Sequence, residues 1–415
     1  MIFLVALLAF YVGWNLGAND VANSMGTSVG SKAITLRQAL IVAGILEFTG
    51  SVVFGGAVSA TLATGVANPN LFVDSPHLLL TGMVAVLIAV GVWMQIATSF
   101  GLPVSSSHAA VGAIAGFSWL AAGVKAVDWS SLGFITLGWI ITPLVSSAIA
   151  ALFYSAIKSW ILDHPYPLGQ LQEWIPWLSA ILLGVFGIVV LPSLTQPASA
   201  WMGDNWGINI SDRNLSIVSG AIATFALTWF SWRQLALSAE TTPQPLLLEQ
   251  QMGRFQVLSA CFVAFAHGSN DVGNAIAPLA TIVYILNTGA VPLQGLSIPL
   301  WILGLGGIGI VGGLAVWGSK VIATIGENII VLQPSSGFCA ELATATTVLL
   351  ASRLGLPVST SHALVGAVVG IGLVQDWHSV RFSTLQSIGL AWLITLPVSA
   401  ILGAGGFFLL RQLIN

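Results

Sequence analysis

Charge is the scarcest property of this sequence. Of its 415 residues only 6% are charged, as 11 Lys or Arg and 14 Asp or Glu, whereas 56% are hydrophobic. Soluble domains carry roughly 25% charged residues, so this composition excludes a chain that covers itself with a charged, water-facing surface. The net charge of −3 is also too small to indicate binding to nucleic acid or to another strongly charged partner.

The sequence also lacks the pattern of a transmembrane β-barrel and that of a cleaved signal peptide. We find no series of alternating segments of about 10 residues, the pattern of a transmembrane β-barrel. The first 16 residues lack the basic stretch and small-residue cleavage site of a signal peptide, so we expect them to remain as a helix. Apolar runs instead repeatedly reach the roughly 20 residues that cross a bilayer as a helix. We therefore predict an all-α polytopic membrane protein.

Cysteine is almost absent. Cys261 and Cys339 both lie in apolar runs, and their spacing fits neither a disulfide framework nor a metal motif. We interpret them as buried structural thiols.

What the sequence does contain is an internal duplication. "GANDVANS" (17–24) resembles "GSNDVGNA" (268–275), 251 positions later, and "GLPVSSSHAAVGAIAG" (101–116) resembles "GLPVSTSHALVGAVVG" (355–370), 254 positions later. Two motif pairs in the same order at nearly equal offsets indicate a duplicated unit. We divide the chain into a first repeat (1–157), a central insert with two membrane helices (158–251) and a second repeat (252–415).

The apolar runs predict about 10–12 membrane helices. Full spans are expected near 1–24, 37–65, 131–157, 175–195, 215–232, 255–286, 297–322 and 384–410. The stretches 78–122 and 335–375 differ, because Gly and Pro interrupt each of them and a Ser/Thr run then suits the start of a second helix. Their second legs, about 15 residues, are too short to cross a bilayer. We predict two helical hairpins with buried tips.

The basic residues orient the chain. With the N-terminus outside, seven of them fall on the cytoplasmic side or its edge and three outside, which the positive-inside rule favours. The seven are Lys32, Arg37, Lys158, Arg233, Arg254, Lys320 and Arg381, and the three are Lys125, Arg213 and Arg411. The two repeats then enter the membrane from opposite sides, so we predict inverted-topology repeats, an architecture that recurs in secondary transporters with a site near the midplane.

The duplicated Asn-Asp clusters predict a cation site. Asp20 and Asp271 lie deep in apolar segments, where an ionised carboxylate costs several kcal/mol unless something pairs with it. No Lys or Arg is near either one in sequence, whereas Asn19, Asn23, Asn270 and Asn274 add amide oxygens. Oxygen ligands suit a hard cation such as Na⁺, by analogy with Ca²⁺ and Mg²⁺. The alternative is a hydrogen-bond network that only packs helices.

The hairpin tips predict an anion site. A helix start attracts anions through its free N–H groups and partial positive charge, and each tip adds hydroxyl donors. These hydroxyls belong to Ser105, Ser106 and Ser107 in the first tip and to Ser359, Thr360 and Ser361 in the second. Two such tips facing one another would bind a tetrahedral oxyanion without any Lys. Ordinary helix capping is the alternative.

The carboxylates bear on which oxyanion this is. Phosphate at neutral pH is largely HPO₄²⁻, which can still donate a proton, whereas sulfate cannot. A site that also holds Asp20 and Asp271 therefore favours phosphate, although bound cations could neutralise both and leave sulfate open.

Six more polar residues stand out in apolar surroundings. His108 and His362 follow the tip triplets and either donate to the anion or satisfy a neighbouring carbonyl. His267, which has Leu16 as its counterpart, is a weaker candidate for proton coupling. Glu47 and Glu341 are intramembrane carboxylates, functional by default, and do not correspond under the repeat offset. Glu341 could join a cation site, and Arg353 either pairs with it or lies near an aqueous cavity.

These motifs resemble those of the inorganic phosphate transporter (PiT) family of secondary carriers. The resemblance, carried by "GANDVANS", "GSNDVGNAIAP" and the paired "GLPVS-S/T-SHA" stretches, covers about 1–157 and 252–415. It implies an inverted-repeat fold, a homodimer and symport of phosphate with Na⁺ or H⁺. By motif it implies cation and substrate roles for Asp20, Asn23, Asp271 and Asn274, phosphate contacts from the tip residues and a role for Glu341. Some members carry sulfate, so substrate and ion stay open.

We therefore predict a symporter of the plasma (inner) membrane that moves inorganic phosphate with Na⁺ or H⁺ by alternating access, without a cofactor. A sulfate permease of the same fold is the main alternative, and a channel is another. An intramembrane hydrolase based on Ser107 and His108 is disfavoured, because neighbours on a helix do not face each other and no nucleophile elbow is present.

Overall fold

The protein is helical throughout the part that the computed structural model describes, which comprises residues 1–102, 104–207, 210–238, 243–293, 295–325, 332–376, 378 and 380–414. The α-helices there are α1 (Ile2–Gly30), α2 (Leu36–Phe54), α3 (Gly56–Thr64), α4 (Pro76–Ser99), α5 (Ser106–Ala122), α6 (Trp129–Ile157), α7 (Pro167–Val189), α8 (Leu191–Trp206), α9 (Asp212–Ser238), α10 (Gln244–Thr288), α11 (Leu300–Ile325), α12 (Pro334–Arg353), α13 (Thr360–Gln375) and α14 (Phe382–Ile414).

Eight of these helices are long and apolar enough to cross a bilayer: α1, α2, α4, α6, α7, α9, α11 and α14. Their outward faces carry large apolar side chains such as Phe3, Phe134 and Phe225, which are 74%, 68% and 73% exposed. Such faces are stable only against lipid or another apolar partner. The chain is a multi-pass membrane protein.

Three predicted spans differ from the structure. The run 175–195 crosses the end of α7 at Val189 and the start of α8 at Leu191, and the run 255–286 lies within α10, which is not among the eight.

The third is the run 37–65, which is not a single helix but breaks at Gly55 into α2 and α3. A Cβ on Gly55 would lie 2.4 Å from the Val272 side chain of α10, so the chain turns where only glycine fits. The hydropathy pattern carried no sign of that contact.

The two halves of the chain are interleaved. α1 packs along α11, and α2 packs along α10, so each signature helix lies against a helix from the other half. The signature glycines permit this close approach. A Cβ on Gly17 would lie 1.9 Å from the Ile310 carbonyl oxygen, and one on Gly268 would lie 2.0 Å from the Glu47 carbonyl oxygen. The backbones of these helix pairs therefore touch.

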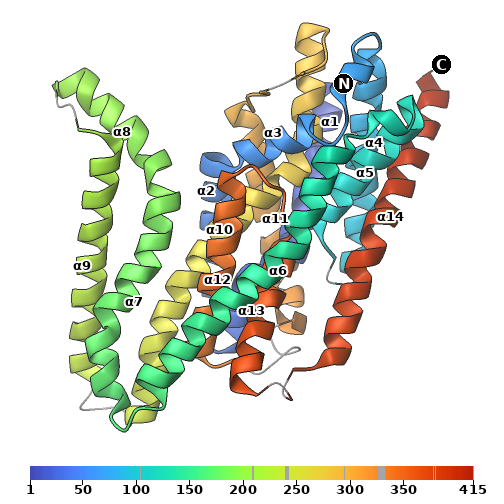
Figure 1. The fold of residues 1–415 in the computed structure, drawn as a ribbon. Coiled ribbons are helices and arrows are strands. Elements are labelled where there is room, and N and C mark those ends of the chain that lie inside the picture. Colours follow the sequence, from blue (N-terminus) through green and yellow to red (C-terminus); the bar gives the residue numbers. More distant parts are fainter. Residues whose placement is uncertain are drawn as a thin grey trace.

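Each hairpin likewise packs on the last helix of the other half. α5 lies along α14 and α13 along α6, with close backbone contact at Gly116 against Ala400 and at Gly370 against Ser147. The α4–α5 hairpin lies toward the end of the molecule that holds both termini, and the α12–α13 hairpin lies toward the opposite end (Figure 1). This arrangement is consistent with inverted repeats.

The insert stands to one side of this body (Figure 1). Its helices α7 and α9 pack mainly on each other, joined by a hydrogen bond from the Trp232 indole N–H to the Gln172 carbonyl at 2.8 Å. α8, which connects them at one end, contacts α9.

Candidate functional site

The two hairpin tips have nearly the same construction. Gly101 and Gly355 adopt positive φ angles of 64° and 68° just after the first legs end, a conformation that glycine adopts without steric cost. Ser105 and Ser359 then cap the second legs, because their hydroxyls accept the backbone N–H of His108 and His362 at 3.3 Å. Capping, one of the two roles expected for the triplets, is thus filled by these two serines.

The tips meet inside the protein. The Ser107 hydroxyl of the first tip donates to the Val358 carbonyl of the second at 2.8 Å. The rings of His108 and His362 lie 4.8 Å apart, edge to face. Both tips are buried, with Ser106 and Thr360 only 4% and 3% exposed. The starts of α5 and α13 are therefore brought together, as the sequence predicted.

The two tip histidines form a crossed brace with two tryptophans. His108 packs on the Trp139 ring of α6 at 3.9 Å, and its Nδ1 lies 3.2 Å from the Trp392 carbonyl of α14. His362 does the reverse, packing on Trp392 at 3.6 Å while its Nδ1 lies 3.1 Å from the Trp139 carbonyl. Each Nδ1 can donate to its carbonyl in one tautomer of the neutral ring. Of the two roles expected for these histidines, the geometry favours the carbonyl contact.

The signature carboxylates lie beside the tips. Asp271 of α10 accepts the Thr360 hydroxyl at 3.0 Å. One ligand atom each from Asp20, His267 and Asp271 lies within 4.8 Å of the others, close enough to share one ion. Both aspartates are buried, at 2% and 0% exposure. The first and second signatures, 251 positions apart, thus meet at one place.

The signature asparagines divide into two pairs. Asn274 donates to the hydroxyls of Ser106 and Ser107 at 3.2 and 3.4 Å, and Asn23 donates to Asp20 at 3.3 Å. These two belong to the aspartate cluster.

Asn19 and Asn270 instead fasten the hairpins. The Asn19 amide donates to the Thr98 hydroxyl near the end of α4 at 3.0 Å. Asn270 donates to the Leu356 carbonyl and accepts from the Val358 N–H, at 3.1 and 3.2 Å. Because its carbonyl oxygen already accepts a hydrogen bond, Asn270 is better placed to hold the second tip than to bind a cation.

His267 lies among three carboxylates. Its Nε2 lies 2.9 Å from Asp271 and 4.0 Å from Asp20, and its Nδ1 lies 3.2 Å from Glu47. Glu47 also accepts the Ser24 hydroxyl at 2.9 Å. A protonated imidazole offers an N–H on both ring nitrogens, so it can face two carboxylates at once. Within the described residues, this ring is the one ionic partner of all three acids.

Several oxygens in this cluster have unmet bonding capacity. Asp20 Oδ2, Asp271 Oδ1, Asn274 Oδ1 and Glu47 Oε2 are buried without a hydrogen-bond partner in the described part of the chain. Buried polar atoms normally find one, and three of the four belong to carboxylates. Converging oxygens of this kind are the ligands that hard cations prefer. Asp20, Asn274 and Asp271 therefore fit a cation site next to the hydroxyls of the tips.

Glu341 lies in a separate polar cluster. Its Oε1 accepts from Thr27 and Ser28 at 2.5 and 2.6 Å and from Gln256 at 3.3 Å, and its Oε2 accepts from Ser259 at 2.9 Å. Its oxygens are therefore occupied by donors. One of the two alternatives for Arg353, pairing with Glu341, is wrong. Arg353 instead donates to the Val189 carbonyl of α7 at 2.7 Å.

Sequence reasoning underrated His267 and Glu47 and missed the donors around Glu341. His267 was visible as a histidine next to the second signature, and Glu47 as an isolated carboxylate in an apolar run. Their convergence depends on α1, α2 and α10 meeting, which no local pattern reports. Thr27 and Ser28 follow the first signature by one helical turn within α1. Including them among the candidate polar residues would have identified two of the donors to Glu341.

The chain is similar to known proteins over nearly its whole length. The chain matches the family model described as "Phosphate transporter family" over residues 16–403. It is 38% identical to a putative phosphate permease of Haemophilus influenzae, covering 100% of this chain and 98% of that protein. It is 40% identical to the chloroplastic inorganic phosphate transporter 2-1 of Arabidopsis thaliana, over 95% of this chain and 70% of that one. A solved sodium-dependent phosphate transporter superposes with a TM-score of 0.88 at 36% identity, covering 99% of both chains.

Proposed function

Because the chain belongs to the phosphate transporter family, we propose that it is a secondary active symporter that moves inorganic phosphate with Na⁺, or with H⁺, by alternating access. The sodium dependence named for the structural neighbour favours Na⁺ as the coupling ion. We also propose that the carrier works as a homodimer in the plasma (inner) membrane. Carriage of phosphate, rather than catalysis, is the activity that this family membership supports.

The observation that carries the proposal is the set of unpartnered oxygens beside two facing helix starts. Among the described residues, Asp20 and Asp271 have no Lys or Arg partner and share one imidazole, His267, while an oxygen of each stays without a hydrogen bond. Burial of such charge is costly unless it is paired. Na⁺ at these oxygens neutralises them and makes room for a doubly charged anion.

Phosphate then binds between the tips. Backbone N–H groups at the starts of α5 and α13 and the hydroxyl of Ser106 supply donors without any Lys. The hydroxyls of Ser107 and Thr360 donate to the Val358 carbonyl and to Asp271 in this structure, and they turn to the anion when it binds. The carboxylate oxygens accept the proton of HPO₄²⁻. Since sulfate has no proton to donate, this arrangement favours phosphate over sulfate.

Uptake of labelled phosphate into proteoliposomes tests the proposal. Asp20→Asn and Asp271→Asn should each abolish Na⁺-driven accumulation while the protein stays folded, because the amide keeps the volume but removes the charge that holds the cation. Asp128→Asn is the matched control, since Asp128 only caps α6 by accepting the Ser131 N–H and Asn caps equally well. Normal sodium-driven accumulation in both signature variants would refute the cation assignment.

The same preparation separates the alternatives. Na⁺ and pH gradients imposed one at a time identify the coupling ion. Excess sulfate should not compete with labelled phosphate, and full competition would favour the sulfate permease. Ser106→Ala and Thr360→Ala should raise the half-saturating phosphate concentration, whereas Ser118→Ala, which removes a hydroxyl bonded only to its own helix, should not.

A further inference from the structure

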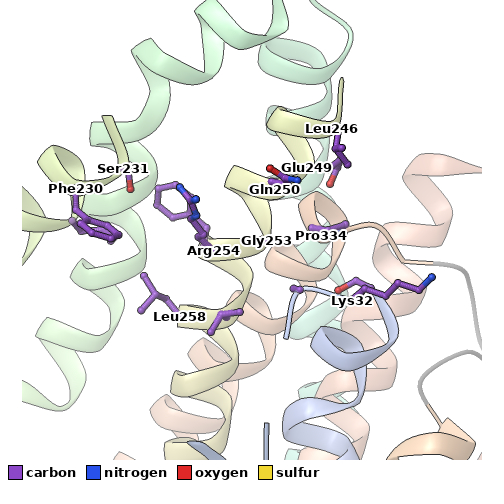
Figure 2. A pocket seen from close by; sticks show the side chains of 15 residues that line it. Lys32, Phe230, Ser231, Leu246, Glu249, Gln250, Gly253, Arg254, Leu258 and Pro334 are labelled. Atoms are coloured by element: carbon purple, nitrogen blue, oxygen red, sulfur yellow. The ribbon is translucent and has the colours of Figure 1, made fainter. Parts of the chain in front are cut away.

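A cavity of about 830 Å³ lies between the insert and the main body, and none of the hairpin-tip residues lines it (Figure 2). Its walls come from α9 of the insert, from the beginning of α10, from the loop after α1 and from Pro334 at the start of α12. It therefore lies at the membrane end opposite the N-terminus, which the distribution of basic residues assigns to the cytoplasm.

Most of its wall is apolar. Leu227 and Phe230 of α9 line one side, and Leu246 and Leu258 of α10 line the other. Phe230 and Leu246 are 50% and 54% exposed, although each lies at a pocket rather than on a flat lipid-facing surface. An apolar cavity of this size at the edge of a bilayer fits hydrocarbon chains better than water.

Its polar lining residues include two cations, Lys32 and Arg254, beside Ser31, Ser231, Glu249 and Gln250. Arg254 lines the pocket, and its guanidinium donates to Gln251 at 2.8 Å. Lys32 flanks the far side, with its ammonium directed away from Arg254 (Figure 2). Within the described residues neither cation has a carboxylate at ion-pair distance. Glu249 also lines the pocket, but its carboxylate is held at the start of α12, where its two oxygens accept the N–H and hydroxyl of Ser335 and the helix start favours negative charge.

Lys32 also has an unusual backbone. Its φ is 63°, the one positive value at a non-glycine position among the described residues, and this conformation costs a side chain roughly 1–2 kcal/mol relative to glycine. The turn needs such a residue, because the N–H groups of Lys32 and Ala33 fold back onto the carbonyls of Val29 and Ser28. Glycine would adopt this turn at lower cost, so Lys32 places a cation at the rim in a backbone conformation that is unfavourable for its side chain.

We propose that this pocket binds an anionic phospholipid of the cytoplasmic leaflet. The head-group phosphate sits at Arg254, the acyl chains lie along Leu227, Phe230 and Leu258, and Lys32, whose ammonium points outward, adds positive charge at the rim. Basic pockets between membrane helices on this side suit anionic head groups, each nearby Lys or Arg contributing about 1 kcal/mol. The lipid fills the space between α9 and α10 and so joins the insert to the transport body.

The apolar walls decide between the sources of phosphate. A vestibule for free phosphate would be lined by polar groups and water, whereas here four large apolar side chains share the lining with Arg254. A second copy of the chain is disfavoured because α9 and α10 of one chain already supply the walls on two sides of the cavity.

Native mass spectrometry of the full-length protein in detergent tests the proposal with phosphatidylglycerol as the probe and phosphatidylcholine as the comparison. Wild-type protein should retain phosphatidylglycerol selectively, and the double variant K32Q/R254Q should bind it roughly tenfold or more weakly. Arg37→Gln is the matched control, a basic residue at the same end that does not line the pocket, and should bind as wild type does. Leu227→Trp keeps both charges but fills the apolar part, and it should weaken retention as well.

Three results would overturn the proposal. Equal retention of phosphatidylglycerol by wild type, K32Q/R254Q and L227W would show that the lipid binds elsewhere. Displacement of the bound lipid by millimolar inorganic phosphate alone would identify a free-phosphate site. Loss of the dimer in K32Q/R254Q with unchanged lipid retention would identify an interface between copies. If K32Q/R254Q does not fold, L227W and R37Q still decide the outcome.

Discussion

The two hairpins share their construction but differ in what reaches them. Both turn at a glycine with positive φ, both are capped by a serine, and both are braced by a histidine against the opposite tryptophan. The helix with the second signature, however, contacts both tips, through Asn274 to the first and through Thr360 and Asp271 to the second. Among the described residues, the first signature donates a hydrogen bond to the first hairpin alone, from Asn19 to Thr98. Duplication supplied the framework, and divergence made α10 the helix that organises the site.

The largest difference between the repeats is His267, where the first repeat has Leu16. His267→Leu makes the second signature like the first and leaves Asp20, Asp271 and Glu47 without their shared partner. Removing one partner from a buried ionic group costs about 3–5 kcal/mol. We expect a variant with a clearly lowered unfolding temperature and no Na⁺-driven phosphate uptake. Wild-type uptake and stability would show that the three acids do not need the imidazole.

The next difference concerns the two asparagines of the aspartate cluster. Asn274→Ala breaks the link from α10 to the first tip, whereas Asn23→Ala removes only a contact within α1. Loss of a buried hydrogen bond costs about 1–3 kcal/mol, so Asn274→Ala should lower kcat/KM for phosphate by roughly tenfold to a hundredfold. Asn23→Ala should lower it less. Equal losses in the uptake assay would mean that the two signatures contribute alike.

The smallest effect is expected for the histidine–tryptophan contacts, which the two hairpins have in common. His108→Phe and His362→Phe keep an aromatic ring but remove the N–H that faces the Trp392 or Trp139 carbonyl. Each should lower the free energy of unfolding by about 1 kcal/mol, and the two values should agree. Chemical denaturation of each variant in detergent measures this. A difference well above 1 kcal/mol would show that the crossed brace is not symmetric in energy.

The framework was largely predictable from sequence, because the repeat offset relates segments 254 positions apart and the Gly-Leu-Pro-Val-Ser pattern marks each turn. The meeting of Asp20 and Asp271 with the tips followed from that duplication. The position of His267 did not, because it depends on three helices converging around one ring. The break at Gly55 was equally hidden, since it is set by Val272 of a distant helix. The roles of Asn19 and Asn270 as fasteners also needed the fold, because their side chains are identical to those of Asn23 and Asn274.

The glycine that opens each signature constrains how this carrier can cycle. With Gly17 against Ile310 and Gly268 against Glu47 at backbone contact, a side chain at either position would push α1 away from α11 or α10 away from α2. We expect each helix pair to move as one unit, because its two backbones are in contact. If the proposed alternating access holds, displacements between these pairs and their surroundings would expose the anion to either side.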